Sequence, residues 1–139
     1  MEQRTTVAII FIASLIISAC GSGGSPANDK TIKSATSSGL TISLASDTGG
    51  IKSGDNDLIL LFADESGKPV DVGAASLKFH MPAMGSMAEM TDAATLTTTD
   101  TPGRYRARVN IEVAGTWEAM VSYQGAKGTG QATMTVNAR

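Results

Sequence analysis

The chain has 139 residues, with 11 basic and 13 acidic side chains and a formal net charge of −2 at pH 7. This slightly acidic balance, without a basic patch interleaved with aromatic residues, argues against a nucleic-acid-binding protein. Cys20 is the only cysteine, so the folded part must be held together by burial alone, without an internal disulfide.

The N-terminal segment has the features of a secretory signal. An apolar stretch of eleven residues runs from Val7 to Ile17, too short to span a bilayer but typical of a signal-peptide core. The following Ile17-Ser18-Ala19-Cys20 resembles the lipobox of bacterial lipoproteins. Residues 1–19 are therefore predicted to be a signal peptide and Cys20 the lipid-bearing residue, anchored in the membrane by its acyl chains. The alternative is a short hydrophobic core segment with a chance cysteine.

Residues 20–37 are predicted to be the lipidated cysteine and a flexible tether, because they are rich in Gly, Ser, Asn, Lys and Thr. Gly21 follows the cysteine, and by resemblance to Gram-negative lipoproteins the absence of Asp there implies the outer membrane. We expect a cell-envelope location with the domain facing the periplasm.

Residues 38–139 are predicted to form one all-β domain, since short alternating segments are separated by turn residues. The segments expected as strands are 40–45, 58–62, 76–81, 94–99, 104–109, 117–123 and 132–136. About seven strands without a helix predict an immunoglobulin-like antiparallel β-sandwich, with a small barrel as the alternative. In one strand, Arg104, Arg106 and Arg108 form a cationic face that we expect to be solvated, or else to contact lipid headgroups or an acidic partner.

The most informative segment of this domain is the methionine run from His80 to Met90. Met81, Met84, Met87 and Met90 recur at a spacing of three. Pro82 and Gly85 disfavour a regular α-helix. Polyproline II and 3₁₀ conformations have about three residues per turn, so either would stack the four methionines along one side.

Thioether sulfurs beside an imidazole form a soft ligand set, which favours Cu(I). The sequence therefore predicts Cu(I), or Ag(I), bound by His80, Met84 and Met87, with Met81 and Met90 as further candidates. The alternative is packing or protein contact, because methionine also fills irregular gaps. Met81 continues the apolar face of Leu77 and Phe79 and can point into the core, with His80 on the opposite side.

Residues 57–90 resemble the YtkA-like and FixH-like periplasmic domains. The matching features are Asp64 with the turn Gly67-Lys68-Pro69-Val70, and the strand that ends in Met81-Pro82-Ala83-Met84. Two downstream patterns also match, Pro102-Gly103-x-Tyr105 and Gly115-x-Trp117. The resemblance, over about residues 38–137, implies an immunoglobulin-like sandwich and an association with copper handling or oxidase assembly. FixH-like members usually have a transmembrane anchor, whereas a lipid anchor is predicted here.

Two functions remain open from the sequence. One is a lipid-anchored protein for copper handling or tolerance, which would meet another copper-handling protein of the envelope. The other is an adaptor that uses the methionine segment as an apolar contact surface. An enzyme is not expected, because the single histidine and the absence of a second cysteine support no catalytic triad.

Overall fold

The structure is a computed structural model that describes residues 28–139. The predicted signal peptide, residues 1–19, and the predicted lipidation site at Cys20 lie outside the described residues. Within the described part, no helix is both long enough and apolar enough to cross a membrane.

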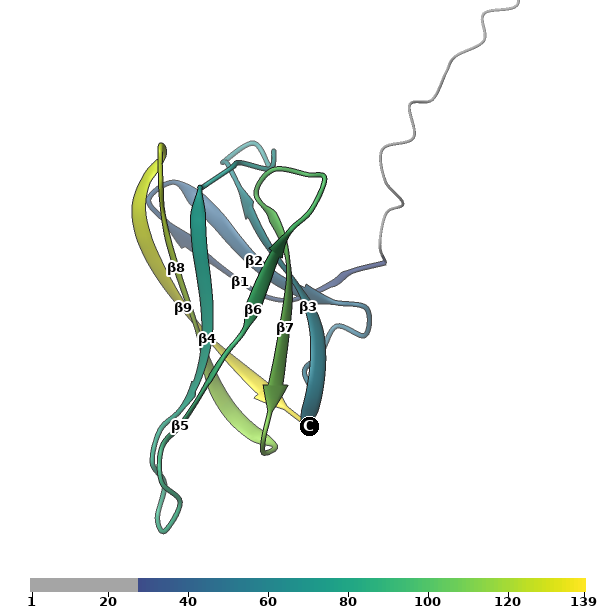
Figure 1. The fold of residues 1–139 in the computed structure, drawn as a ribbon, viewed down its shortest axis with the longest axis vertical. Coiled ribbons are helices and arrows are strands. Elements are labelled where there is room, and N and C mark those ends of the chain that lie inside the picture. Colours follow the sequence, from purple (N-terminus) through teal and green to yellow (C-terminus); the bar gives the residue numbers. More distant parts are fainter. Residues whose placement is uncertain (1–27) are drawn as a thin grey trace, which may run out of the picture.

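Nine strands make up the described part of the chain (Figure 1). They are β1 (Lys30–Ser37), β2 (Leu40–Ser46), β3 (Gly54–Ala63), β4 (Ala74–Met81), β5 (Met90–Ala93), β6 (Thr95–Thr98), β7 (Arg104–Ile111), β8 (Gly115–Gly125) and β9 (Gly128–Ala138). Five form one sheet in the order β1-β2-β3-β7-β6, and four form the other in the order β5-β4-β8-β9. All strand pairs are antiparallel, so the predicted antiparallel sandwich is confirmed.

The strand alternation predicted from the sequence sets the two faces of each sheet. In β7, Tyr105, Ala107 and Val109 are buried while Arg106 and Arg108 are exposed. The apolar run from Leu58 to Phe62 lies in β3, the middle strand of the five-stranded sheet, as its lack of polar residues predicted. The inward faces of both sheets meet in one hydrophobic core that includes Trp117, Phe62, Phe79, Ile42, Leu60 and Ile111.

Directly after the methionine run, the chain crosses from the four-stranded sheet to the five-stranded sheet. β5 belongs to the four-stranded sheet and β6 to the five-stranded sheet, and only Ala94 separates them. The backbone N–H of Ala94 donates to the carbonyl of Leu77 at 2.9 Å. This bond ties the crossing point to β4, so the base of the β4–β5 hairpin is fixed to the sandwich.

The strand count and one boundary differ from the sequence prediction. The expected count was about seven, but nine strands are present, because β1 and β5 were not expected. β1 occupies residues 30–37 of the predicted tether. It is an edge strand in which only Ile32 and Ala35 are half-buried hydrophobic residues, so its sequence has too little apolar alternation to indicate a strand.

The turn after β3 is held by the carboxylate of Asp64. Oδ1 of Asp64 accepts hydrogen bonds from Oγ of Ser66 at 2.6 Å, from the Ser66 backbone at 2.9 Å and from the Lys68 backbone at 3.0 Å. The Ser66 hydroxyl, followed by the Lys68 N–H, lowers the pKa of Asp64 below its usual value. Gly67 has a φ of 83° in this turn, a conformation that glycine adopts without strain.

Candidate functional site

The methionine run forms a β-hairpin that projects from one end of the sandwich (Figure 1). At its base, Met81 of β4 pairs with Met90 of β5. At its tip, the N–H of Met84 donates to the carbonyl of Met87 at 3.1 Å, and the N–H of Met87 donates back to Met84 at 2.9 Å. Gly85 and Ser86 form the two-residue turn between them, and Gly85 has a φ of 58°, as primed hairpin turns require.

The expected stacking of four methionines along one side of a three-residue turn is therefore wrong. A spacing of three, folded back at Gly85, places the methionines opposite one another on two antiparallel segments. They form two cross-strand pairs, which we call the base pair (Met81 and Met90) and the tip pair (Met84 and Met87). Gly85 adopts the positive φ that this hairpin turn needs at its first central position. The hairpin turn therefore forms in place of a polyproline II or 3₁₀ segment.

The tip pair is open to solvent. Met84 is 57% exposed and Met87 is 46% exposed. Directly opposed residues in an antiparallel pair have Cβ atoms about 4.5–5.5 Å apart and side chains on the same face. Two flexible thioether side chains can then bring both sulfurs to one ion, so the tip pair can supply two sulfur donors.

The base pair is part of the core. Met81 is 3% exposed, and Met90 is half-buried against the hydrophobic cluster. A Cβ added at Gly115, the first residue of β8, would lie 2.9 Å from Cε of Met81. The core position anticipated for Met81 from the face of Leu77 and Phe79 is confirmed, and Met81 is not available to an ion that reaches the tip from solvent.

His80 lies on the outer face of the four-stranded sheet, as the strand alternation predicted. Its ring is paired with Thr91, whose Oγ1 lies 3.2 Å from Nδ1, and its Nε2 lies 4.0 Å from a carboxylate oxygen of Glu89. The histidine side chain is 25% exposed and Glu89 is 73% exposed. Because His80 and Met81 are consecutive in β4, His80 faces away from the buried base pair.

The five predicted ligands are thus divided among three places: a tip pair, a core pair and a histidine on the outer face. The donor chemistry of the tip fits a soft monovalent ion, while a four-sulfur site does not fit because Met81 is enclosed. Among residues 28–139, no group of three or more His, Cys, Asp or Glu side chains has metal-binding geometry.

Met120 is a further solvent-accessible thioether that the sequence interpretation did not select as a site residue. It is 44% exposed and pairs with Lys78 on the outer face of the four-stranded sheet, the face that also has His80 and Glu118. Its position could have been inferred from the sequence, since Met120 stands among the outward residues that alternate with Trp117, Ala119 and Val121. It lies on the sheet rather than at the hairpin tip.

The carboxylate of Asp92, near the base of the hairpin, has one buried oxygen atom, Oδ2, without a hydrogen-bond partner among the described residues. Asp92 lies opposite Phe79 in β5, two residues after Met90. A carboxylate is a hard donor that suits Cu(I) poorly, so Asp92 does not enlarge the soft ligand set of the tip.

Comparison with known protein families gives one match. A family model described as YtkA-like covers residues 34–122, more than half of the chain. No curated protein matches the chain significantly. The matched range includes the whole methionine hairpin and ends within β8, before β9 completes the four-stranded sheet. The chain therefore belongs to the YtkA-like family, while its resemblance to FixH-like domains stays a prediction.

Proposed function

We propose that this member of the YtkA-like family is a cell-envelope lipoprotein that binds Cu(I), or Ag(I), at the tip pair. The observation that carries the proposal is the pairing of Met84 and Met87, two exposed thioethers held opposite each other by two backbone hydrogen bonds. The protein would handle copper or confer tolerance to it. No catalytic step is part of this proposal.

The chemistry of the tip favours a soft ion over other cations. Thioether sulfur is neutral and does not titrate in the physiological range, so binding there needs no deprotonation. The tip segment also contains no cysteine. A cysteine thiol would be open to oxidation in an oxidising envelope. The two methionines would hold the ion and the hairpin would present it to solvent.

Further donors would have to come from the flanks of the tip. His80 and Met90 are the nearest candidates along the two strands, although they lie on opposite faces of the sheet. Met90 is half-buried, and His80 is next to Glu89. We propose His80 as the more accessible of the two, because its imidazole already lies on an outer face. Met81 is left out of the proposed ion site since it packs against Gly115.

The proposed location is the periplasmic side of the outer membrane, with a lipid anchor at Cys20. An exposed tip on a tethered domain suits exchange of the ion with a second copper-handling protein of the envelope. The support for the location comes from the signal-like segment and the lipobox pattern at Ile17-Ser18-Ala19-Cys20.

A competition titration tests the copper proposal. A form of the protein comprising residues 21–139, which includes all nine strands, is titrated with Cu(I) against a colorimetric chelator. Replacing Met84 and Met87 together by Leu keeps the volume and removes the sulfurs, so affinity should fall by at least tenfold while the melting temperature changes little. Met120→Leu is the matched control, an exposed thioether on another strand, and it should leave affinity unchanged.

A second candidate function follows from the same exposed pair. The tip segment is uncharged between Pro82 and Ala88, and an adaptable methionine surface of this kind also suits contact with a protein partner. An adaptor predicts that the parent protein does not compete with the chelator at all. In that event the copper proposal fails, and the double leucine variant should instead keep its partner binding.

A further inference from the structure

A groove beside the β2–β3 loop is lined by more cationic than anionic side chains, whereas the chain as a whole has a net negative charge. The volume of the groove is about 930 Å³. Its lining contains six cationic side chains, Lys33, Lys52, Arg104, Arg106, Arg108 and Arg139, and four carboxylates, Asp29, Asp47, Asp55 and Asp57. The lining therefore has a balance of +2, whereas the remaining five basic and nine acidic residues of the chain have a balance of −4. The positive charge of the protein is concentrated on this side.

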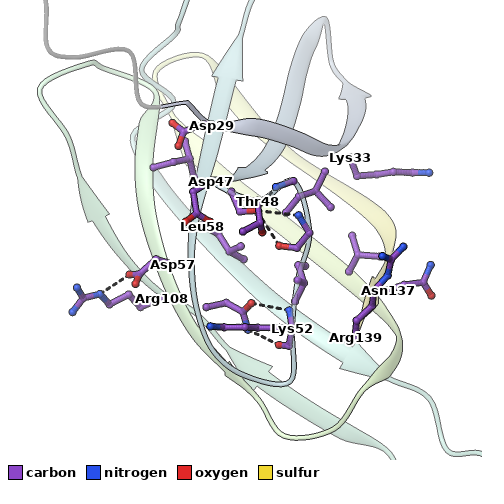
Figure 2. A pocket seen from close by; sticks show the side chains of 18 of the residues that line it. Asp29, Lys33, Asp47, Thr48, Lys52, Asp57, Leu58, Arg108, Asn137 and Arg139 are labelled. Atoms are coloured by element: carbon purple, nitrogen blue, oxygen red, sulfur yellow. Dashed lines mark hydrogen bonds and ion pairs between the residues drawn. The ribbon is translucent and has the colours of Figure 1, made fainter.

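Only part of this cationic charge is neutralised by neighbouring carboxylates. Arg104 is paired with Asp29, and Nε of Arg108 lies 2.9 Å from Asp57. No ion pair within the described residues involves Lys33, Lys52, Arg106 or Arg139. Figure 2 shows Arg108 at one side of the groove, Lys33 and Arg139 at the other, and Lys52 between them. Of the cations without an ion pair, Lys52 thus lies near the middle of the groove, and Lys33 and Arg139 lie on the side opposite Arg108.

The loop that presents Lys52 is held in place by two buried polar side chains. Asn56 accepts the Lys52 N–H at 2.9 Å and donates to the Lys52 carbonyl at 2.7 Å. Ser46 accepts the N–H groups of Gly49 and Gly50 at 3.0 and 3.1 Å. Ser46 is 3% exposed and Asn56 is 7% exposed. The backbone at Lys52 is therefore fixed by the fold, and its exposed side chain begins from a defined point on the lining of the groove.

The groove is also where the described chain begins. Asp29 lines it and is paired with Arg104 across the sheet. The predicted lipid-bearing Cys20 is nine residues earlier in the sequence, and a chain extends at most about 3.3–3.6 Å per residue. An anchor at Cys20 would keep Asp29 within about 30 Å of the bilayer surface. Figure 1 shows β1 beginning well away from the methionine hairpin, so a domain with the groove toward the membrane leaves the tip pair free.

We propose that this groove docks on the anionic phosphates of the lipid surface, through Lys33, Lys52, Arg106 and Arg139. The inference rests on the lipid-anchor part of the proposed function and is independent of its copper part. Each basic residue near an anionic bilayer adds a small attraction that fades within the Debye length. Four unpaired cations on one side would orient the tethered domain, with the hairpin directed toward the periplasm.

Binding to lipid vesicles tests the proposed docking on a protein that lacks the lipid anchor at Cys20. The form comprising residues 21–139 is mixed with vesicles of phosphatidylglycerol and phosphatidylethanolamine, or of phosphatidylcholine alone, and bound protein is measured by sedimentation. We expect binding to the anionic vesicles that weakens as salt is raised, and little binding to phosphatidylcholine. Arg106→Gln combined with Lys52→Gln should reduce partitioning on the order of tenfold or more.

The matched control removes two positive charges elsewhere. Lys78→Gln combined with Lys127→Gln changes the net charge equally, at the outer face of β4 and in the β8–β9 turn, and should keep most of the binding. Far-UV circular dichroism and melting curves establish that both variants fold. Equal losses in the two variants, or no binding of the parent to anionic vesicles, would overturn the proposal.

Two further measurements separate the possible outcomes. A melting-temperature rise with inorganic phosphate that is abolished in the Arg106 and Lys52 variant would indicate a discrete phosphate site instead of a lipid surface, and would also overturn the proposal. The Met84 and Met87 leucine variant should bind anionic vesicles like the parent, while the Arg106 and Lys52 variant should bind Cu(I) like the parent. Failure of one proposal therefore leaves the other intact.

Discussion

The two methionine pairs of the hairpin have the same residue type, and in each pair the two residues lie opposite each other across the hairpin, yet their surroundings differ. Met81 is enclosed in the core beside Gly115, and Met90 packs half-buried against the same cluster. Met84 and Met87 are exposed at the turn. The hydrophobic core ends between the two pairs, and that boundary decides what each sulfur can do. Thioethers in the core contribute packing, whereas those beyond it are available as ligands.

Truncation of the buried member should have the largest effect on stability. Met81→Ala removes a side chain that fills the end of the core, and we expect a loss of about 2–4 kcal/mol in the free energy of unfolding. Met84→Ala should cost less than about 0.5 kcal/mol, because exposed positions away from special features are nearly neutral. Urea unfolding of both variants measures the difference. Equal losses would mean that the two pairs are not separated by the core boundary.

A change in the turn should affect the tip pair with little effect on the core. Gly85→Ala forces a left-handed φ on alanine, which costs about 1 kcal/mol locally, although the added Cβ would meet nothing within 4 Å. Because the tip projects beyond the core, we expect a small change in global unfolding and a several-fold loss of Cu(I) affinity as the register of Met84 and Met87 loosens.

Gly67→Ala is the matched control for that substitution. Gly67 also has a positive φ and open space around its Cβ, but it lies in the Asp64 turn at the other end of β4. The control should strain its own turn and leave Cu(I) affinity unchanged. Should both variants lose affinity alike, the effect would come from general loosening and not from the tip.

The pH dependence of stability should differ between the Asp64 turn and the hairpin turn at Gly85. This is the smallest of the effects that we expect. Hydrogen bonds to the carboxylate hold the folded-state pKa of Asp64 below the ordinary value of an aspartate, so its contribution to stability is present above the unfolded pKa and is lost as pH falls through the folded pKa. Asp64→Asn should therefore be slightly less stable than the parent at pH 7, with the gap closing in acid. The thioethers of the tip do not titrate, so the double leucine variant should follow the parent at every pH.

Most of the fold could be predicted from the sequence because inward and outward residues alternate clearly. The strand with Tyr105, Ala107 and Val109 and the apolar strand from Leu58 to Phe62 gave strong signals. β1 was missed since its edge position requires few buried side chains. β5 was missed because it begins at Met90, the last residue of the methionine run, so that its four residues read as a continuation of that segment.

The candidate site was only partly predictable. The residue types that make the segment unusual, and the opposite orientations of His80 and Met81, follow from spacing and alternation. The pairing of Met84 with Met87 does not, because a spacing of three fits several extended conformations equally well. The positive φ at Gly85 selects the hairpin, and a single glycine in the sequence can serve several turn types. The grouping of free cations beside the β2–β3 loop was also hidden, since it joins residues far apart in the chain.

The identity of the atoms around a bound Cu(I) tests the central claim most directly. X-ray absorption at the copper edge, on protein loaded with one equivalent of Cu(I), should show sulfur scatterers in the parent and in the Met120→Leu control. In the variant with leucine at positions 84 and 87, the sulfur contribution should disappear. A sulfur shell that persists in that variant, or a parent shell composed only of nitrogen and oxygen, would contradict the assignment of the ion to the hairpin tip.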